Sequence, residues 1–482
     1  MKELEKLLNL NNYKIIKQEE RKENNKMKKI IYLESKNKKE KCPNCEEYTK
    51  SIHDKLKPIE LKYLKIAEYE CKINIVKKRF ICHKCNKKFT ESVDLNGKGK
   101  TISNKLEQKV LKDLLNYNLS IKYIADNNNI SDYAVRKILK NAMSEYPEHI
   151  VNLPRVISLD EFKADTNEGK YAFILNDPIH RKALDVLPSR KKEYLIQYFT
   201  YCNNRHSVEY VISDMYEPYL LVQQIMFPHA KYVVDRFHYT RYIMDALDKV
   251  RIKLQKEYGY NSKEYRMLKN KKNVTLLRKY SNDIDWWTYT KRYKNGHMVD
   301  ILRYDLREQL LNINEELHQA YILKELFLDL LNYSDYEHAE EEIKEWIGVC
   351  KGCGIEEFEE ASKTINNWLE YIVNSFIDKR FSNGYTEGLN NKIKVIKRVA
   401  FGYRNFRFFR LRLMYILNGK ISGITKKDRN QKNWKNKCYQ PQKNIKNFQT
   451  QKIRDNPLFY FRLLIFRSPL EIDEPFFLYI MI

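Results

Sequence analysis

From about residue 154, the spacing of apolar residues changes repeatedly between the two-residue period of strands and the 3.6-residue period of helices. Three short apolar segments come first and predict strands: PRVISLDEF, GKYAFILND and RKALDVLP. A helix is predicted next at RKKEYLIQYFTYC. Strand, helix, strand and helix then follow at VEYVISD, EPYLLVQQIMF, KYVVD and RFHYTRYIMDALDKVRIKL. We therefore expect an α/β domain to begin near residue 151.

The order of these segments (three strands, helix, strand, helix, strand, helix) is the ribonuclease H-like arrangement. It predicts the first part of such a core over residues 151–244. Asp160 ends the first predicted strand and Asp214 ends the fourth, and these two strands are neighbours in a sheet of this kind. The pattern therefore predicts two aspartates close together at one edge of the sheet.

Residues 245–375 are helical in pattern, charged and poor in strand signals, so we expect an all-helical insertion in the core. The last part of the core is expected at residues 376–420. One face of a predicted helix there is polar: Glu387, Asn391, Lys394 and Arg398. The opposite face is apolar: Leu389, Ile393, Ile396 and Ala400. We expect the polar face to bind metal and DNA and the apolar face to pack.

Residues 96–150 are predicted to form a helix-turn-helix DNA-binding domain. Ser120 and Ser131 are suited to cap two short helices that follow a longer one. The second short helix would pack through Val135, Ile138, Leu139 and Ala142. Its outer face would contact DNA through Tyr133, Arg136, Lys137 and Lys140. A plain helical hairpin is the alternative.

Two cysteine pairs, Cys42-Pro-Asn-Cys45 and Cys82-His-Lys-Cys85, lie in residues 41–95. Two thiolates on each of two tight turns can converge on one tetrahedral Zn²⁺, so this segment predicts a zinc ribbon with strands between the pairs. The alternative is that the two pairs are unrelated. Cys71 and His83 are expected to be bystanders. A third pair, Cys350 and Cys353, has no partner pair nearby and is interpreted as a coincidence.

The ends of the chain carry weaker signals. Residues 1–40 are treated as an N-terminal segment, and residues 421–482 as a basic and then apolar tail without a clear period. No secretory signal and no run of about 18 apolar residues is found. The nine cysteines are odd in number, which argues against a disulfide scaffold and favours a reducing cytoplasm.

Three carboxylates stand where they could hold a metal: Asp160, Asp214 and Glu387. Mg²⁺ in proteins is held by a few carboxylates and keeps positions free for phosphate oxygens of a substrate. A pair of such ions can stabilise both the attacking and the leaving oxygen of a phosphoryl displacement. The alternative is that these acids are ordinary solvated side chains.

Charge favours a nucleic acid as the partner. The 482 residues include 89 Lys and Arg against 63 Asp and Glu, which gives a formal net charge of +26. Such a surplus attracts polyanions, because neutralising phosphates releases condensed counterions. The alternative is a protein that is basic because its whole proteome is.

Together these motifs resemble the DDE transposases of bacterial insertion sequences, in the branch called the ISL-three family, from about Cys42 to Leu417. The segments that carry the likeness are CPNC, CHKC, VISLDEF, SDMYEPY, AKYVVDRFH and NGYTEGLNNKIKVIKRVAFGYRN. The resemblance implies catalysis by Asp160, Asp214 and Glu387 with Mg²⁺ or Mn²⁺, a structural Zn²⁺, and cleavage followed by strand transfer. It also implies double-stranded DNA as partner, at terminal inverted repeats and at target sites. A homodimer or larger assembly on the bacterial nucleoid, without membrane, is expected.

Asp235 and His238, in VVDRFH, resemble an element that related transposases carry after the second aspartate. They could support the metal ligands or position DNA, as could Asn391, Lys394 and Arg398. The alternative for Asp235 and His238 is a structural hydrogen bond that fixes the turn from strand to helix. Asp235 is also the alternative second metal ligand. Two functions remain as rivals to transposition: a DNA-binding regulator with an inactive transposase core, and a structure-specific nuclease without strand transfer.

Overall fold

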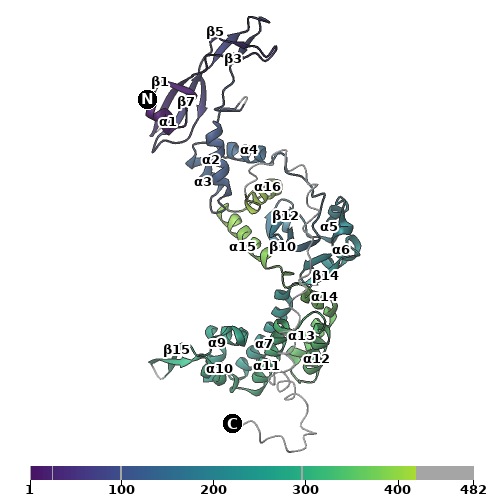
Figure 1. Ribbon diagram of the computed structural model, residues 1–482. Coiled ribbons are helices and arrows are strands. Elements are labelled where there is room, and N and C mark those ends of the chain that lie inside the picture. Colours follow the sequence, from purple (N-terminus) through teal and green to yellow (C-terminus); the bar gives the residue numbers. More distant parts are fainter. Residues whose placement is uncertain (1, 24, 98–99, 295–296, 420–482) are drawn as a thin grey trace, which may run out of the picture. The chain divides into compact units, whose positions relative to one another are not determined.

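The computed structural model describes residues 2–419 except residues 24, 98–99 and 295–296, and the predicted tail at 421–482 lies outside this range (Figure 1). The described chain divides into two compact units. The first unit contains the chain up to Glu148, a short excursion at Ala164–Lys170, and the chain from Leu389 onward. The second contains His149–Lys163 and Tyr171–Gly388. No helix in the described part is long and apolar enough to cross a membrane.

The first unit begins with a four-stranded sheet in the order β1-β2-β7-β6. Its elements are α1 (Lys2–Leu7), β1 (Tyr13–Glu23), β2 (Lys26–Ser35), β6 (Ile59–Lys62) and β7 (Glu70–Val76). A core that includes Leu33, Leu61 and Ile73 lies beneath it. The sequence analysis assigned no strands to residues 13–35, yet β2 runs parallel to β7 and so joins this segment to the region of the cysteine pairs.

The cysteine pairs lie on short strands beside this sheet. Their elements are β3 (Glu40–Lys41), β4 (Tyr48–Thr49), β5 (Ile52–Lys55), β8 (Lys78–Ile81) and β9 (Lys88–Thr90). β3 pairs with β4, and the three-stranded sheet has the order β5-β8-β9. Phe80 and Phe89 pack with the four cysteines, so each pair sits on a turn that an apolar cluster holds in place.

Three helices follow: α2 (Asn104–Leu115), α3 (Ile121–Asn127) and α4 (Asp132–Ala142). The predicted caps are confirmed, since Ser120 Oγ accepts the Tyr123 N–H and Ser131 Oγ accepts the Ala134 N–H. The predicted packing face of α4 holds for Val135, Ile138 and Leu139, all buried. Ala142 is a correction: it is exposed, and Met143, one residue later, is buried instead because the helix ends there.

The same unit contains most of α15 (Gly384–Val399) and all of α16 (Phe406–Leu417). α16 packs on the helices before it through polar as well as apolar contacts. Arg412, 1% exposed, donates from Nη2 to the carbonyls of Asn116 and Leu119, at 3.4 and 3.3 Å. Tyr415 Oη donates to the carbonyl of Leu111 at 3.0 Å. These bonds fix α16 to α2 and to the turn that follows it.

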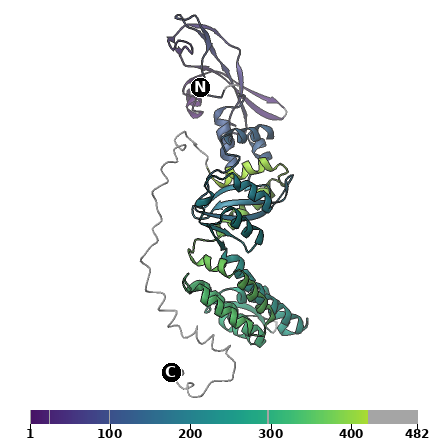
Figure 2. The ribbon, with the colours of Figure 1, turned by 90° about the vertical axis from the view of Figure 1, so that its right-hand side faces the viewer.

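The second unit is built on a five-stranded sheet in the order β12-β11-β10-β13-β14. Figure 2 shows this sheet among the teal strands. Its strands are β10 (Val156–Thr166), β11 (Gly169–Asp177), β12 (Lys182–Leu187), β13 (Tyr210–Ser213) and β14 (Lys231–Val234). β13 runs parallel to both β10 and β14, whereas β11 and β12 are antiparallel. The predicted order of strands and helices is confirmed.

One prediction about this sheet is wrong. Asp160 does not end its strand, because β10 continues to Thr166. The pairing of β10 with β13, however, covers only Val156–Ser158 of β10. Asp160 therefore lies just past the ladder with β13, and Asp214 follows β13 directly. Both aspartates therefore lie just beyond the residues through which β10 and β13 pair, although only Asp214 follows the end of its strand.

Different layers cover the two faces of the sheet. Ile157 and Leu159 belong to the large core that also contains side chains of α5 (Lys192–Thr200) and α6 (Glu217–Met226). Figure 1 labels these two helices. Because side chains alternate along a strand, Ser158 and Asp160 face the other way. On that side Ile212 and Val233 pack with Phe381, just before α15. The face that carries Asp160 is thus the face on which α15 begins.

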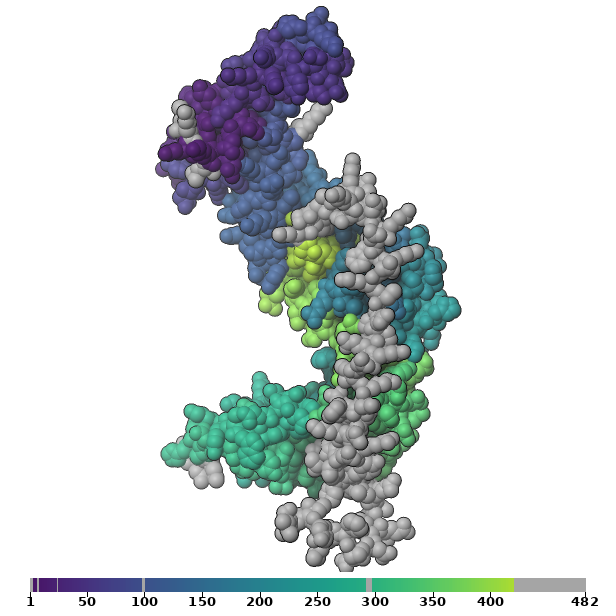
Figure 3. Space-filling view, in the orientation of Figure 1, coloured from purple at the N-terminus to yellow at the C-terminus, as the bar shows by residue number. Residues whose placement is uncertain are grey.

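The predicted insertion is mainly helical, and its helices are α7 (Arg236–Glu257), α8 (Lys263–Lys269), α9 (Lys271–Arg278), α10 (Arg303–Leu311), α11 (Glu315–Tyr333), α12 (Ala339–Lys351), α13 (Glu356–Asn367) and α14 (Leu369–Val373). It is not all-helical, which is a correction. The hairpin of β15 (Tyr289–Lys294) and β16 (His297–Leu302) projects from the helices (Figures 1 and 3). The Asn-Gly dipeptide between its strands is the local signal for such a hairpin.

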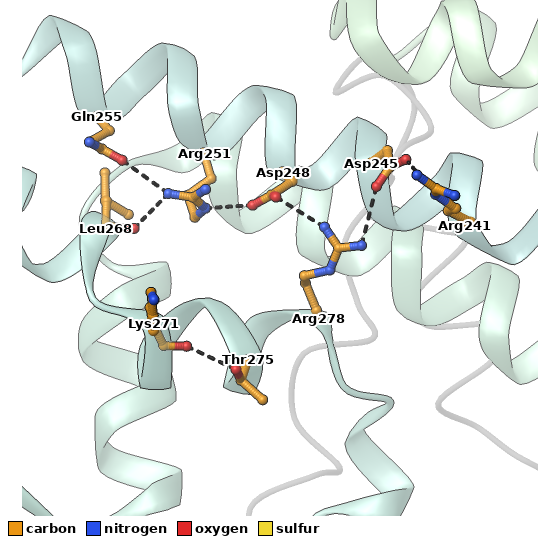
Figure 4. Close-up of polar contacts among 9 residues, drawn as sticks. All are labelled: Arg241, Asp245, Asp248, Arg251, Gln255, Leu268, Lys271, Thr275 and Arg278. Atoms are coloured by element: carbon orange, nitrogen blue, oxygen red, sulfur yellow. Dashed lines mark hydrogen bonds and ion pairs between the residues drawn. The ribbon is translucent and has the colours of Figure 1, made fainter. Parts of the chain in front are cut away.

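A chain of ion pairs ties α7 to α9 in this region (Figure 4). Arg251 Nε lies 2.7 Å from Asp248 Oδ1, and Arg278 bridges Asp248 and Asp245 at 3.0 and 3.2 Å. Arg251, which is buried, also donates to the carbonyl of Leu268 at 2.7 Å. Its charge is therefore paired as well as hydrogen-bonded, which a buried guanidinium requires.

Candidate active site and metal centre

Asp160 lies on β10 among other acidic groups. Its Oδ1 accepts the N–H of Glu161 at 2.7 Å. Burial and the neighbouring charge of Asp214 raise the pKa of Asp160 to about 7. A carboxylate held in this way gains from a nearby cation, because the cation offsets both the desolvation and the repulsion between like charges.

Asp214 is held against His238 of α7. The Oδ1 atom of Asp214 lies 2.7 Å from His238 Nε2, so the two side chains form an ion pair when the imidazole is protonated. Burial by itself would lower the pKa of His238, but the carboxylate of Asp214 outweighs it and raises the pKa. Carboxylate oxygens are the ligands that a hard cation such as Mg²⁺ takes in proteins, so Asp214 could serve as one.

Asp235 follows β14 and is 3% exposed. Its Oδ1 accepts the N–H of Asn383 at 2.9 Å, and His238 Nε2 lies 3.9 Å from its Oδ2. Burial raises the pKa of Asp235, and the charges of Asp214 and Glu387 act in the same direction. Asp235 therefore connects the end of β14 to the residues just before α15.

Glu387 lies in the first turn of α15 and is exposed. The preceding residue fixes that turn to the sheet: Thr386 Oγ1 shares a 3.0 Å hydrogen bond with Ser158 Oγ and accepts another from Asn176 Nδ2 at 3.0 Å. Ser158 lies two residues before Asp160 on the same face of β10. The sequence analysis missed Ser158, Asn176 and Thr386, and strand alternation around Asp160 was the signal for the first of them.

The three predicted acids come from separate elements, and the fold brings these elements together. They do not form a closed metal cage, however. Within the described residues, the four cysteines are the one group of three or more ligating side chains whose atoms all lie within 4.8 Å of one another. An open set of acids fits Mg²⁺ better than a closed one does, because Mg²⁺ is bound through one or two carboxylates together with waters and substrate phosphates.

A fourth carboxylate, Glu161, is neutralised locally. It accepts hydrogen bonds from Arg190 Nη1 and from Tyr219 Oη, the latter at 2.5 Å. The Arg190 guanidinium also lies 4.4 Å from the centre of the Tyr171 ring. Glu161 and Asp160 point to opposite faces of β10, so these partners hold Glu161 apart from the predicted acids. The sequence analysis assigned no role to any of these residues.

The predicted polar face of α15 is present beyond its first turn, in the first unit. Asn391, Lys394 and Arg398 are all exposed, and Lys394 Nζ donates to Asn391 Oδ1 at 3.4 Å. The opposite face is buried at Leu389, Ile393 and Ile396. Ala400, predicted to be on that face, is half-buried and lies one residue beyond the helix.

The four cysteines fit a zinc ion. With Zn–S bonds of about 2.3 Å, a tetrahedral site places its sulfurs about 3.8 Å apart. Cys42 Sγ lies 3.6 Å from Cys85 Sγ, and Cys45 Sγ lies 3.5 Å from Cys82 Sγ. The backbone N–H of Lys87 and the neighbouring thiols lower the pKa of the Cys85 thiol, whereas burial and the neighbouring thiols raise the pKa of Cys45, so the four sulfurs share their charge as one set. Cys350 and Cys353 are free thiols and belong to no such group in the described chain.

The exposed side of α4 carries the predicted DNA-contacting residues. Tyr133 is 73% exposed, and Lys137 and Lys140 are exposed too. Arg136 is exposed, but its guanidinium stacks 4.4 Å from the centre of the Phe408 ring on α16. The sequence pattern could not anticipate this contact, because Phe408 is far along the chain.

Comparison with known proteins agrees with this geometry. Residues 157–413 match the ISL3 transposase family, and residues 38–85 match the zinc-finger of the transposases of IS204, IS1001, IS1096 and IS1165. A transposase for insertion sequence element IS1001 from Bordetella parapertussis is 23% identical over 387 residues, which are 80% of this chain and 90% of that protein. A Lactococcus lactis subsp. lactis protein described as an ATP-dependent protease is 32% identical over 124 residues, 26% of this chain and 38% of that protein.

The family match covers more than half of the chain and includes every element that carries the predicted acids. The zinc-finger match covers the four cysteines whose sulfurs converge. A zinc ribbon at the N-terminal side and a transposase core are therefore both present. The chain belongs to the ISL3 family of transposases and is an insertion-sequence transposase, a DNA-transposing enzyme that carries a structural zinc site.

Proposed function

We propose that this transposase uses a DDE mechanism in which Asp160, Asp214 and Glu387 hold Mg²⁺ or Mn²⁺. The observation that carries the proposal is the bonding of Thr386, next to Glu387, to Ser158 and Asn176 of the sheet that bears Asp160. It brings the start of α15 to the face of Asp160. The order of the five strands supports a ribonuclease H-like core, since the pairing β10-β13-β14 is parallel and β11-β12 is antiparallel.

The roles of the three acids follow from their surroundings. Burial and the nearby charge of Asp214 raise the pKa of Asp160, so Asp160 would be the ligand common to two ions, and Asp214 would be a further ligand. Glu387 is exposed and so can reach a ligand position that DNA has to approach. When bound, such ions activate the attacking oxygen and stabilise the leaving oxygen of an in-line displacement. The reactions would be hydrolysis at the element end and attack of the freed 3′-OH on target DNA.

Asp235 and His238 would support this site from behind. Asp235 fixes the backbone of Asn383 before α15, and His238 holds the carboxylate of Asp214. Partners of metal ligands orient them and tune their basicity. Asp235 is thus a positioning residue, although it remains the alternative second ligand.

Asp235→Asn should reduce cleavage of element ends by about 10- to 100-fold, the usual loss when a group behind the ligands is changed. The amide keeps an oxygen that can accept the Asn383 N–H, so the thermal midpoint of unfolding should change little. The measurement is the rate of end cleavage on a plasmid substrate, with Asp214→Asn in parallel. An inactive Asp235→Asn beside an active Asp214→Asn would mean that Asp235 is the second ligand.

We further propose that α2, α3 and α4 form a helix-turn-helix that binds the terminal inverted repeats, with α4 in the major groove. Support comes from the two serine caps, the buried face of α4 and the exposed Tyr133, Lys137 and Lys140. Because the transposase must bring two ends together, a homodimer or larger assembly on DNA is expected. Because Arg136 stacks on Phe408, this arginine contributes to the packing of α4 on α16 as well as to the proposed DNA contact.

Lys137→Ala should weaken binding to inverted-repeat DNA and lower the salt dependence of log K by about one, the effect of removing one phosphate contact. Binding is measured by fluorescence anisotropy over a range of salt concentrations. Lys256→Ala, at an exposed lysine in the second unit, is the matched control and should leave both quantities unchanged. Equal behaviour of the two variants would place end recognition elsewhere.

A plasmid that carries two element ends tests the proposed mechanism as a whole. Cleavage at the ends together with joined products supports a transposase that completes strand transfer. Cleavage without joining would favour the structure-specific nuclease. Specific binding without any cleavage, with Mg²⁺ or Mn²⁺ present, would favour the DNA-binding regulator with an inactive core.

A further inference from the structure

Phe401 stands out among the exposed apolar side chains of the described chain. It lies in the loop between α15 and α16 and is 99% exposed, more than any other large hydrophobic residue described. A phenylalanine in this position buries nothing, although most of its kind are found in protein cores. The Phe401 side chain therefore contributes no packing to the folded protein.

The backbone at Phe401 is unfavourable for this residue as well. The N–H of Phe401 bonds to the carbonyl of Arg398 at 3.1 Å, and the N–H of Gly402 bonds to that of Lys397 at 2.9 Å. This is the helix-ending motif whose left-handed residue is usually glycine. Here that residue is Phe401, with a φ of 52°, and the glycine follows it. Both the side chain and the backbone of Phe401 thus oppose its presence.

The residues that follow Phe401 nevertheless fix the loop in place. The N–H of Asn167 bonds to the carbonyl of Arg404 at 2.8 Å, and the N–H of Phe406 bonds to Asn167 Oδ1 at 3.0 Å. Tyr403 is buried and stacks on Phe409 with ring centres 4.8 Å apart. Phe401 is therefore displayed from a loop that hydrogen bonds and packing hold in one position.

Basic side chains surround this exposed ring along the chain. Lys394 and Arg398 precede it, and Arg404 and Arg407 follow it, all four exposed. Such a combination matches a polyanion that also offers flat apolar surfaces, which is nucleic acid. Proteins that bend DNA commonly insert an apolar side chain between base pairs, while basic neighbours hold the phosphates.

We propose that Phe401 is a wedge that inserts between adjacent base pairs of the double-stranded DNA bound by this transposase. The proposal rests on DNA binding by the transposase and does not depend on which carboxylates are catalytic. The wedge unstacks one step and bends the duplex, and the arginines on either side of it take the phosphates. The unfavourable exposure and backbone conformation of Phe401 in the free protein are then offset by its contacts with the bases in the complex.

The test uses the full-length protein and duplexes in which 2-aminopurine, a base that fluoresces when unstacked, replaces adenine at successive positions. One duplex carries the terminal repeat read from the DNA beside the gene, and the other has the same composition in scrambled order. The variants are Phe401→Gly, Phe401→Ala and Phe401→Trp. Tyr260→Ala, which removes another highly exposed aromatic ring, is the control.

The wild-type protein, Phe401→Trp and Tyr260→Ala should raise the fluorescence at one step. Phe401→Gly and Phe401→Ala should abolish this signal and weaken binding by about tenfold, the effect of losing one contact between an aromatic ring and a base. The thermal midpoint of Phe401→Gly should equal or exceed that of the wild type, because glycine adopts a positive φ without cost. A signal with the repeat alone assigns the wedge to the element end, and a signal with both duplexes assigns it to any bound DNA.

Two results would overturn the proposal. A signal that persists in Phe401→Gly while its thermal midpoint falls would make Phe401 a structural residue. An unchanged signal with an altered mass by light scattering would instead make it a contact between two copies of the chain. Asp160→Asn is measured in parallel and should keep the signal, so a failure of the proposed catalytic mechanism cannot be mistaken for a failure of the wedge.

Discussion

Replacing Asp160, Asp214 or Glu387 by the corresponding amide should lower cleavage and strand transfer by roughly a thousandfold or more. Each change removes one negative ligand from a site that has to concentrate divalent cations, whose stabilisation of transition-state charge is worth several kcal/mol. Burial and the charge of Asp214 raise the pKa of the metal-free Asp160 carboxyl to about 7, and bound cations would offset both effects. Conversion of supercoiled donor plasmid with Mg²⁺ or Mn²⁺ is the measurement.

Binding to element ends should survive in all three variants, because the proposed recognition helices lie at residues 104–142. Asp305→Asn, at an exposed acid in the insertion, removes the same charge without touching the site and should keep full activity. Undiminished cleavage by all three amide variants would rule out the DDE mechanism. Loss of cleavage together with loss of end binding would show instead that the variants are misfolded.

Removing zinc should unfold the region of the four cysteines. Binding of a structural Zn²⁺ provides roughly 10 kcal/mol or more of folding free energy in small zinc modules, and the sulfur distances of 3.5 and 3.6 Å suit that ion. Metal analysis of the full-length protein should find one equivalent of zinc. Cys82→Ser, or treatment with a strong chelator, should abolish it and expose this segment to proteolysis.

Cys71→Ser serves as the matched control for the zinc prediction. Cys71 is also a buried cysteine of the first unit, but it packs in the core of the four-stranded sheet and is not part of the sulfur cluster. The substitution should lower stability through lost packing while the zinc content stays at one equivalent. Zinc that remains bound in Cys82→Ser, or is lost in Cys71→Ser, would contradict the assignment of the ligands.

Local patterns in the sequence were sufficient to predict many individual elements. The segment GKYAFILND corresponds to β11, and RFHYTRYIMDALDKVRIKL begins where α7 begins. The serine caps of α3 and α4 were equally readable, since a cap depends on residues three positions apart. The end of β10 and the β15–β16 hairpin were not predicted correctly. The end of β10 mixes apolar and charged residues, so alternation alone did not decide where the strand stops. The hairpin did carry a local signal, its Asn-Gly dipeptide, which the prediction of an all-helical insertion left out.

The sequence by itself determined the spacing of the two cysteine pairs, the order of strands and helices in the core, and the two faces of α15, because these depend on neighbouring residues and on fixed periods. Only the tertiary structure decided which distant groups meet. Ser158 and Thr386, 228 positions apart, share a hydrogen bond, and Asp214 meets His238 across two different elements. It also decided that β2 pairs with β7 and that Arg136 stacks on Phe408. Such contacts depend on how whole elements pack, which no local period of the chain encodes.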